Sequence, residues 1–167
     1  MKKLLLSLLA LIAVAVGASA QQIQLGYGGF TQMDNSDMHA DAGKINNAWG
    51  ALTAGVNFNV MPKLKLGVSY TFSSASFKKW DGNAYYHVLM ANAYYRYYSN
   101  SIVRLYGHLG IGADITHVSD IDETKGYFAF QISPLGAEVG LSPKTAIFAE
   151  LGYGAQGLLQ AGVRFNL

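Results

Sequence analysis

The sequence predicts an all-β fold, an eight-stranded antiparallel up-and-down barrel, from three observations. Apolar and polar residues alternate along many segments, as in residues 159–167, where every odd position is apolar. Charged residues make up 13% of the chain, about half of the roughly 25% that is usual in soluble domains. No segment after residue 20 is apolar over the roughly 20 residues that a spanning helix needs. Together these features are typical of a transmembrane β-barrel, whose lipid-facing and lumen-facing residues alternate.

Residues 1–20 have the layout of a cleaved signal peptide. Lys2 and Lys3 precede an apolar run over residues 4–16, and Ala18-Ser19-Ala20 provides a small-residue cleavage site. This run is too short for an anchoring helix, which needs roughly 20 residues. We therefore expect one barrel domain over residues 21–167. The chain has no cysteine, so no disulfide framework is expected in it.

The first four strands are predicted from apolar residues at every second position. They cover about residues 22–30, 48–60, 64–73 and 84–98. Their apolar faces run, in order, through Ile23, Leu25 and Tyr27; Leu52, Ala54, Val56, Phe58 and Val60; Leu66, Val68, Tyr70 and Phe72; and Leu89, Ala91, Ala93, Tyr95 and Tyr97.

The last four strands follow the same rule over about residues 102–115, 126–141, 145–153 and 159–167. Their apolar faces include Val103, Leu105, Leu109, Ile111 and Ala113; Phe128, Phe130 and Ile132; Ile147, Ala149 and Leu151; and Leu159, Ala161, Val163, Phe165 and Leu167. In the strand over 126–141 the apolar parity changes after Ser133-Pro134. Because proline cannot donate a ladder hydrogen bond and a bulge inserts one residue, the change predicts a β-bulge there.

Three polar segments are predicted as loops, at residues 32–47, 74–83 and 116–125. They follow the first, third and fifth strands, whereas the connections after the second, fourth and sixth strands are short. Outer-membrane barrels have this asymmetry, with short periplasmic turns and longer external loops. Tyrosines near the predicted strand ends suit the lipid–water boundary; they are Tyr27, Tyr70, Tyr85, Tyr97, Tyr127 and Tyr153.

The segment Ile132–Leu167, ISPLGAEVGLSPKTAIFAELGYGAQGLLQAGVRFNL, resembles the end of the outer membrane protein beta-barrel domain family. The whole mature chain is similar in pattern to the small eight-stranded barrels of Gram-negative outer membranes. The resemblance implies an outer-membrane location, and it implies that the barrel-assembly machinery reads the last strand through Val163, Phe165 and Leu167. The terminal Leu departs from the Phe that is commoner at this position.

Ionisable residues gather on the non-lipid face, where a closed barrel would place them in the lumen. They are Lys65, Arg96, Arg104, His108, Asp114, Glu138, Glu150 and Arg164. The lumen of an eight-stranded barrel is filled by side chains, and charges buried in it must be paired or hydrated. We expect a central ionic network with a structural role, in which Glu138 and Glu150 face Arg96, Arg104 and Arg164.

The expected function is a non-enzymatic structural and surface-interaction role, by a monomer that displays polar loops. Its partners would be membrane lipids and lipopolysaccharide, whose phosphates Lys44, Lys78 and Lys79 could pair with. Without Lys2 and Lys3 the basic and acidic residues balance, so no nucleic acid is expected as a partner.

Three alternatives remain open from the sequence. A soluble, lipocalin-like barrel that binds a hydrophobic ligand would show the same alternation with the apolar face inside. A narrow gated channel for small solutes could open by exchange of partners in the ionic network. A lipid-modifying barrel enzyme would need a nucleophile and a base, for which Ser119 and His117 lie close to Asp120. His39 and Asp41 have no ligand spacing, so neither a metal site nor a cofactor is predicted.

Overall fold

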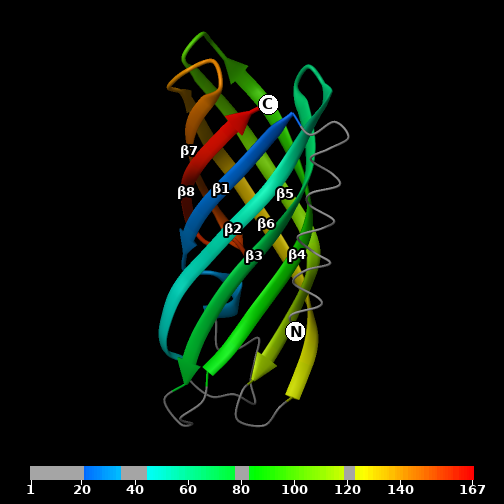
Figure 1. The fold of residues 1–167 in the computed structure, drawn as a ribbon, viewed down its shortest axis with the longest axis vertical. Helices are drawn as coiled ribbons and strands as arrows, with labels where there is room; N and C mark the ends of the chain where they lie inside the picture. The colour runs from blue at the N-terminus through cyan, green and yellow to red at the C-terminus, as the bar shows by residue number, and fades with distance from the viewer. Residues whose placement is uncertain (1–20, 35–44, 78–82, 119–122) are drawn as a thin grey trace.

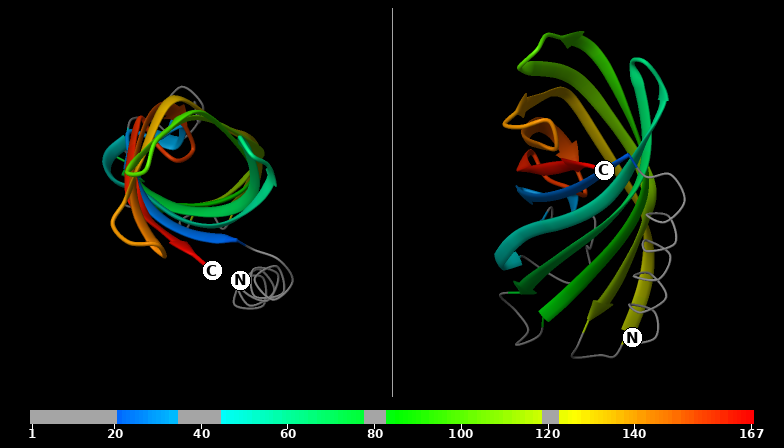
Figure 2. Two further views of the ribbon diagram at one scale, coloured as in Figure 1. Left: turned by 90° about the horizontal axis from the view of Figure 1, so that it is seen from above. Right: turned by 45° about the horizontal axis from the view of Figure 1, so that its top comes forward.

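The computed structural model describes residues 21–34, 45–77, 83–118 and 123–167, which form a closed barrel of eight antiparallel strands (Figures 1 and 2). The strands are β1 Gln22–Gly29, β2 Ile45–Met61, β3 Leu64–Phe77, β4 Asn83–Ser99, β5 Val103–Val118, β6 Glu123–Gly140, β7 Thr145–Gly154 and β8 Leu159–Asn166. The predicted fold class is therefore confirmed, while the predicted signal peptide lies outside the described residues. Within these residues, no helix is long and apolar enough to cross a membrane.

The last strand closes the barrel. Ile23 of β1 lies opposite Phe165 of β8, and the ladder continues without a break to Gly29 opposite Leu159. The backbone amide of Leu167 donates to the carbonyl of Gln21 at 3.1 Å, so the two ends of the described chain meet at one end of the barrel (Figure 1). We call this end, which also carries the short turns at residues 62–63, 100–102 and 141–144, the turn end. The opposite end is the loop end.

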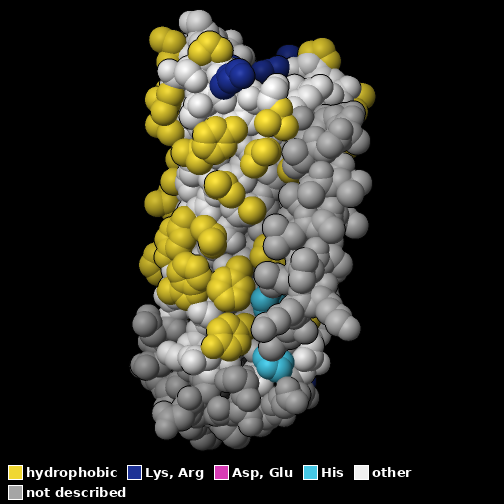
Figure 3. Space-filling view, in the orientation of Figure 1, with side chains coloured by type: hydrophobic (Ala, Val, Ile, Leu, Met, Phe, Trp, Pro, Cys, Tyr) yellow, Lys and Arg dark blue, Asp and Glu magenta, His cyan; other side chains and the backbone are white. Residues whose placement is uncertain are grey.

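The strand alternation separates an apolar outer wall from the lumen. Leu109 and Ile111 of β5 are 59% and 64% exposed on the wall, whereas their neighbour His108 is 1% exposed. Figure 3 shows apolar side chains along the outer wall and lysine and arginine side chains at the turn end. A wall of this kind suits contact with lipid tails.

The predicted bulge in β6 is confirmed. Ile132 pairs with Tyr153 and Leu135 with Leu151, so β6 uses one residue more than β7 over this interval. The ladder to β5 shifts at the same place, between Tyr106 and His108. As a result, Ile132 and Leu135 both face outward although three positions separate them.

The predicted loop boundaries are wrong, because the strands continue into the polar segments. β2 begins at Ile45, β3 ends at Phe77, and β5 and β6 reach Val118 and Glu123. A ladder that extends beyond the lipid can carry polar residues on both faces, so polarity alone does not mark its end. β4 is 17 residues long and β8 only 8, which makes one side of the barrel much taller at the loop end.

The loop end of the lumen is filled by an apolar cluster. It comprises Met33, Ala75, Ala84, Tyr86, Val88, Met90, Ala129 and Ala155. Met33 belongs to the 3-10 helix η1, Gln32–Asp34, which follows β1. The side-chain amide of Gln32 binds the backbone of β6, to Phe128 O and Phe130 N, both at 3.1 Å. The start of the first connection, through Met33, and the β7–β8 connection, through Ala155, thus both pack into this cluster.

Candidate functional site

Arg164 of β8 is the centre of the polar half of the lumen. Its position follows from the alternation of the last strand, since Val163 and Phe165 belong to the apolar series and Arg164 points inward. The guanidinium donates from Nη1 to Glu138 at 2.8 Å and from Nη2 to Glu150 at 3.1 Å. Its Nε donates to the side-chain oxygen of Gln24 at 3.2 Å. A buried cation therefore has two carboxylates and an amide as partners.

Glu150 of β7 accepts further hydrogen bonds from β5. The hydroxyl of Tyr106 donates to its Oε1 at 2.8 Å, and His108 Nδ1 lies 2.8 Å from its Oε2. The other ring nitrogen of His108 lies 3.0 Å from Asn92 Oδ1, and the Asn92 amide donates to Ser69 at 2.8 Å. A chain of polar contacts thus crosses the lumen from β7 to β3.

Aromatic rings enclose the guanidinium of Arg164. Its carbon lies 4.3 Å from the ring centre of Phe148, 4.7 Å from that of Tyr106 and 5.1 Å from that of Tyr94. These are cation–π distances, and a desolvated cation benefits most from such rings. Tyr94 also stacks on His108 at 4.2 Å between centroids. The rings and the ionic groups leave little free space in the middle of the barrel.

The predicted lumen residues divide into three groups in space. The first group is a connected ionic cluster in which Arg164 binds both Glu138 and Glu150. His108 also binds Glu150, and Arg104 binds the second oxygen of Glu138. Lys65 and Arg96 lie nearer the turn end; Lys65 donates to Gln22 at 3.1 Å, and Arg96 binds the carbonyl of Pro62. Asp114 lies apart in the other half of the barrel, where it accepts a 3.2 Å hydrogen bond from Thr116.

Several partners of this cluster were not singled out from the sequence. They are the uncharged residues Gln24, Asn92, Tyr94, Tyr106 and Phe148. All occupy inward positions of their strands, so the parity of each strand was the signal that could have found them. A search restricted to ionisable residues passes over amides and rings that complete the same network.

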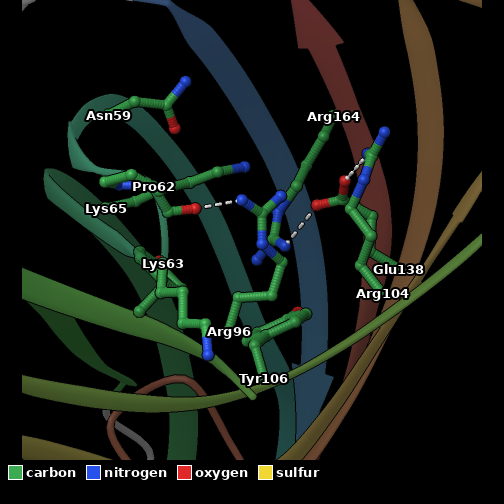
Figure 4. A pocket seen from close by; sticks show the side chains of 10 residues that line it. Asn59, Pro62, Lys63, Lys65, Arg96, Arg104, Tyr106, Glu138 and Arg164 are labelled. Carbon is green, nitrogen blue, oxygen red and sulfur yellow. Dashed lines mark hydrogen bonds and ion pairs between the residues drawn. The ribbon is translucent and has the colours of Figure 1, made fainter. Parts of the chain in front are cut away.

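The lumen opens into a cavity of about 400 Å³ at the turn end. Lys65, Arg96, Arg104 and Asn59 line this cavity and also a deeper pocket of about 20 Å³ that reaches Tyr94, Tyr106 and Arg164 (Figure 4). The free volume therefore falls sharply where Arg164 and its rings lie. The ionic cluster forms the floor of the cavity.

No group of three metal-ligating side chains occurs in the described ranges. His117 lies 3.3 Å from the hydroxyl of Thr124 on the neighbouring strand. Ser119 and Asp120, the other members of the enzymatic alternative, lie outside the described residues, as do His39 and Asp41. Lys44, Lys78 and Lys79, expected to meet lipid phosphates, also lie outside them.

The last strand carries the residues of the expected assembly signal on the wall. Val163 lies between Leu25 and Ile147 of the two neighbouring strands. Phe165 and Leu167 are 40% and 66% exposed. The apolar side of β8 is thus available to lipid or to a protein that binds the strand.

Comparison with known proteins identifies the family. Residues 6–165 match the model of the outer membrane protein beta-barrel domain. The chain belongs to this family. Its location is the outer membrane, and the apolar wall contacts membrane lipids. Because outer-membrane barrels have short periplasmic turns and longer external loops, we assign the turn end to the periplasm and the loop end to the exterior.

Among solved structures, the chain is similar to Ail, the attachment invasion locus protein of Yersinia pestis. The two share 17% sequence identity with a TM-score of 0.45, over 87% of this chain and 94% of Ail. No curated protein matches the sequence significantly.

Proposed function

We propose that this outer-membrane barrel is a non-enzymatic, non-conducting protein that displays a protruding β-sheet for contact with partners outside the cell. The observation that carries the proposal is the unequal length of the strands around a filled lumen. Lipopolysaccharide next to the outer wall and molecules beyond it are the partners that this geometry favours.

The protruding sheet consists of the external parts of β2 to β6. Within the described residues, β1 pairs with β2 only as far as Gly28 opposite Ala51, and β7 pairs with β6 only from Gly154 opposite Gln131. A strand as long as β4, of 17 residues, rises about 40 Å at roughly 3.3 Å per residue and about 45° of tilt. The apolar band of such barrels is only about 25 Å high. The taller strands therefore extend well beyond the lipid.

The two side strands of this sheet rise past their shorter neighbours. Residues 45–50 of β2 and 124–128 of β6 extend past β1 and β7, which flank them lower in the barrel. Aromatic side chains near the base of the sheet support its position at the lipid boundary; Trp49 lies 6.0 Å from both Tyr27 and Phe72, centroid to centroid.

A symmetric shortening of the β5–β6 hairpin tests the display role. Thr116 pairs with Lys125, His117 with Thr124 and Val118 with Glu123, so deleting these pairs preserves the register of the remaining ladder. We expect cells with the shortened protein to lose retention on surfaces coated with extracellular proteins or polysaccharides that hold wild-type cells. Heat-modifiable migration on gels would verify that the barrel still folds. Equal retention of both cells would contradict the display role of this hairpin.

Conductance measurements test the proposal that the barrel does not conduct solutes. The apolar cluster packs in the lumen at the loop end, and Arg164 with its carboxylates packs in it nearer the turn end. Purified protein in planar bilayers should therefore be electrically silent at both polarities, whereas a gated small-solute path would give discrete openings. The same preparation should show no phospholipid deacylation; activity that is lost in Ser119→Ala would instead support the enzymatic alternative.

The ends of the chain have roles of their own in this proposal. Residues 1–20 act as an export signal, so the mature protein begins at Gln21. The barrel-assembly machinery recognises the end of the chain through the apolar residues Val163, Phe165 and Leu167. Mass spectrometry of protein isolated from outer membranes would verify the first point through the mass of the mature chain.

A further inference from the structure

We propose that the periplasmic mouth of the barrel is a binding site for a phosphate-like oxyanion. The site is the cavity of about 400 Å³ at the turn end, with Lys65, Arg96 and Arg104 in its lining. This inference is independent of the proposed display function, since it concerns the opposite end of the molecule.

The cavity has more positive than negative side chains. The deeper part adds Lys63 and Arg164 to the cations, while Glu138 is the one carboxylate among its lining residues. That carboxylate is already shared by two guanidinium groups, since Arg104 binds one of its oxygens and Arg164 the other. Arg164 is balanced further by Glu150. Lys65 and Arg96 thus bring more positive charge into the mouth than Glu138, which already binds Arg104 and Arg164, can balance.

These two cations form hydrogen bonds with neutral groups. Lys65 Nζ donates to the side-chain oxygen of Gln22 at 3.1 Å. The Arg96 guanidinium binds the carbonyl of Pro62 (Figure 4). Both side chains are half-buried. Partly buried cations are stabilised by an anion, and guanidinium and ammonium groups form their strongest hydrogen bonds with carboxylate or phosphate oxygens. A bound oxyanion would supply this missing charge.

The shape of the cavity fits a small ligand from water rather than from the bilayer interior. Its volume falls within the range of roughly 300–1,000 Å³ that small-molecule pockets occupy. It lies inside the mouth of the barrel, and Asn59 and Asn166 add polar groups to its rim. The floor is closed by Arg164 and its rings. A phosphate-like group from a periplasmic solute, or from the headgroup of an inner-leaflet lipid, could reach it.

The distribution of charge along the barrel agrees with an anion site at this end. Among the described residues, the periplasmic half has two acidic side chains, Glu138 and Glu150, against the basic side chains of Lys63, Lys65, Arg96, Arg104, Lys144 and Arg164. The other acidic residues that the structure describes, Asp34, Asp114 and Glu123, belong to the other half. The positive field is therefore focused at the periplasmic mouth.

Calorimetric titration with inorganic phosphate tests the site, using the full mature chain refolded in zwitterionic detergent at low ionic strength. We expect saturable binding, and a dissociation constant raised about tenfold in Lys65→Gln and in Arg96→Gln, in line with the loss of one charge-assisted hydrogen bond. Lys144→Gln is the matched control, because it removes the same charge at the same end but does not line the cavity. It should bind phosphate like the wild type.

Nanodiscs distinguish the two sources of the oxyanion. In phosphatidylcholine nanodiscs phosphate should bind as in detergent. Suppression of binding in phosphatidylglycerol nanodiscs, with recovery in phosphatidylcholine, would assign the site to a lipid headgroup; binding in both would assign it to a periplasmic solute. Absence of phosphate binding by wild-type protein, or an equal loss in Lys144→Gln, would overturn the proposal. Heat-modifiable migration of each variant excludes misfolding as the cause of a loss.

Discussion

Arg164 on the closing strand lies 2.8 Å from Glu138 on β6, so its side chain bridges two strands that are not neighbours. β7 lies between them in the barrel, and its Glu150 contacts the same guanidinium at 3.1 Å. One residue thus connects the three last strands from inside. Because β8 also pairs with β1, this contact stabilises the seam at which the two ends of the chain meet.

Removing this guanidinium should strongly destabilise the barrel. Arg164→Met leaves two carboxylates buried without their shared cation, and breaking a buried ion pair in this way costs about 3–5 kcal/mol. Urea unfolding of the refolded protein in lipid vesicles would measure the change in the free energy of unfolding. Lys144→Met, on an exposed turn at the same end, should change it by less than about 1 kcal/mol.

A double variant separates the lost charge from the lost packing. Glu150→Gln removes one of the two carboxylate charges that Arg164→Met leaves without its cation. The double variant should therefore lose less free energy of unfolding than the sum of the losses in the two single variants. Strict additivity of the two effects would contradict coupling between Arg164 and Glu150.

A second prediction concerns the close approach of β8 to β1. A Cβ atom added at Gly162 would come within 2.7 Å of Gly26 Cα and 2.8 Å of a ring carbon of Phe148. Gly162→Ala should therefore destabilise the barrel by about 1–3 kcal/mol through overpacking, as measured by urea unfolding. Gly126→Ala is the control, because a Cβ there meets no atom within 4 Å. Equal stability of the two variants would contradict crowding at the seam.

The sequence was sufficient to predict the barrel because each strand has one continuous apolar face. Period-2 alternation placed Leu109 and Ile111 on the wall and Arg164 in the lumen, and the parity change at Pro134 located the bulge. The strand ends were not predictable in the same way. Ladder hydrogen bonds continue above the lipid at Phe77 and Val118, where solvent removes the requirement for an apolar face.

The sequence predicted which side of each strand the site residues occupy, but not how far along the barrel axis each residue lies. Alternation places Asp114 and His108 on the same side of β5, yet Asp114 pairs across to Tyr127 of β6 while His108 pairs with Ser133 at the bulge. Which inward residues meet depends on strand register and shear, and neither leaves a signal in one sequence. The apolar cluster around Met33 depends on a connection that folds back into the lumen, which the polarity of that segment did not indicate.

The bulge in β6 supports a deletion experiment. The ladder to β7 gains one residue of β6 between Ile132 and Leu135, and the ladder to β5 gains one between Ser133 and Gly136. Pro134 lies in both intervals, so deleting it would restore a regular ladder without changing which residues face the lipid. We expect the Pro134 deletion to refold into a heat-modifiable barrel. Deleting Ala149 from the regular strand β7 would invert the faces of one half of that strand and should abolish refolding. The opposite pattern would contradict the assigned register.

Replacing Phe165 tests the outer face of the closing strand. Phe165 is 40% exposed on the wall, opposite Ile23 of β1. A charge on the lipid face costs about 0–1 kcal/mol near the interface and more toward the midplane, so Phe165→Asp should lower stability modestly in vesicles. If the assembly machinery also reads this residue, its level in outer membranes should fall much further than stability alone explains. Phe165→Leu and Asn166→Ser are the controls, because neither adds charge to the wall. Equal insertion of Phe165→Asp and Asn166→Ser would contradict the assignment of faces on the strand that closes the barrel.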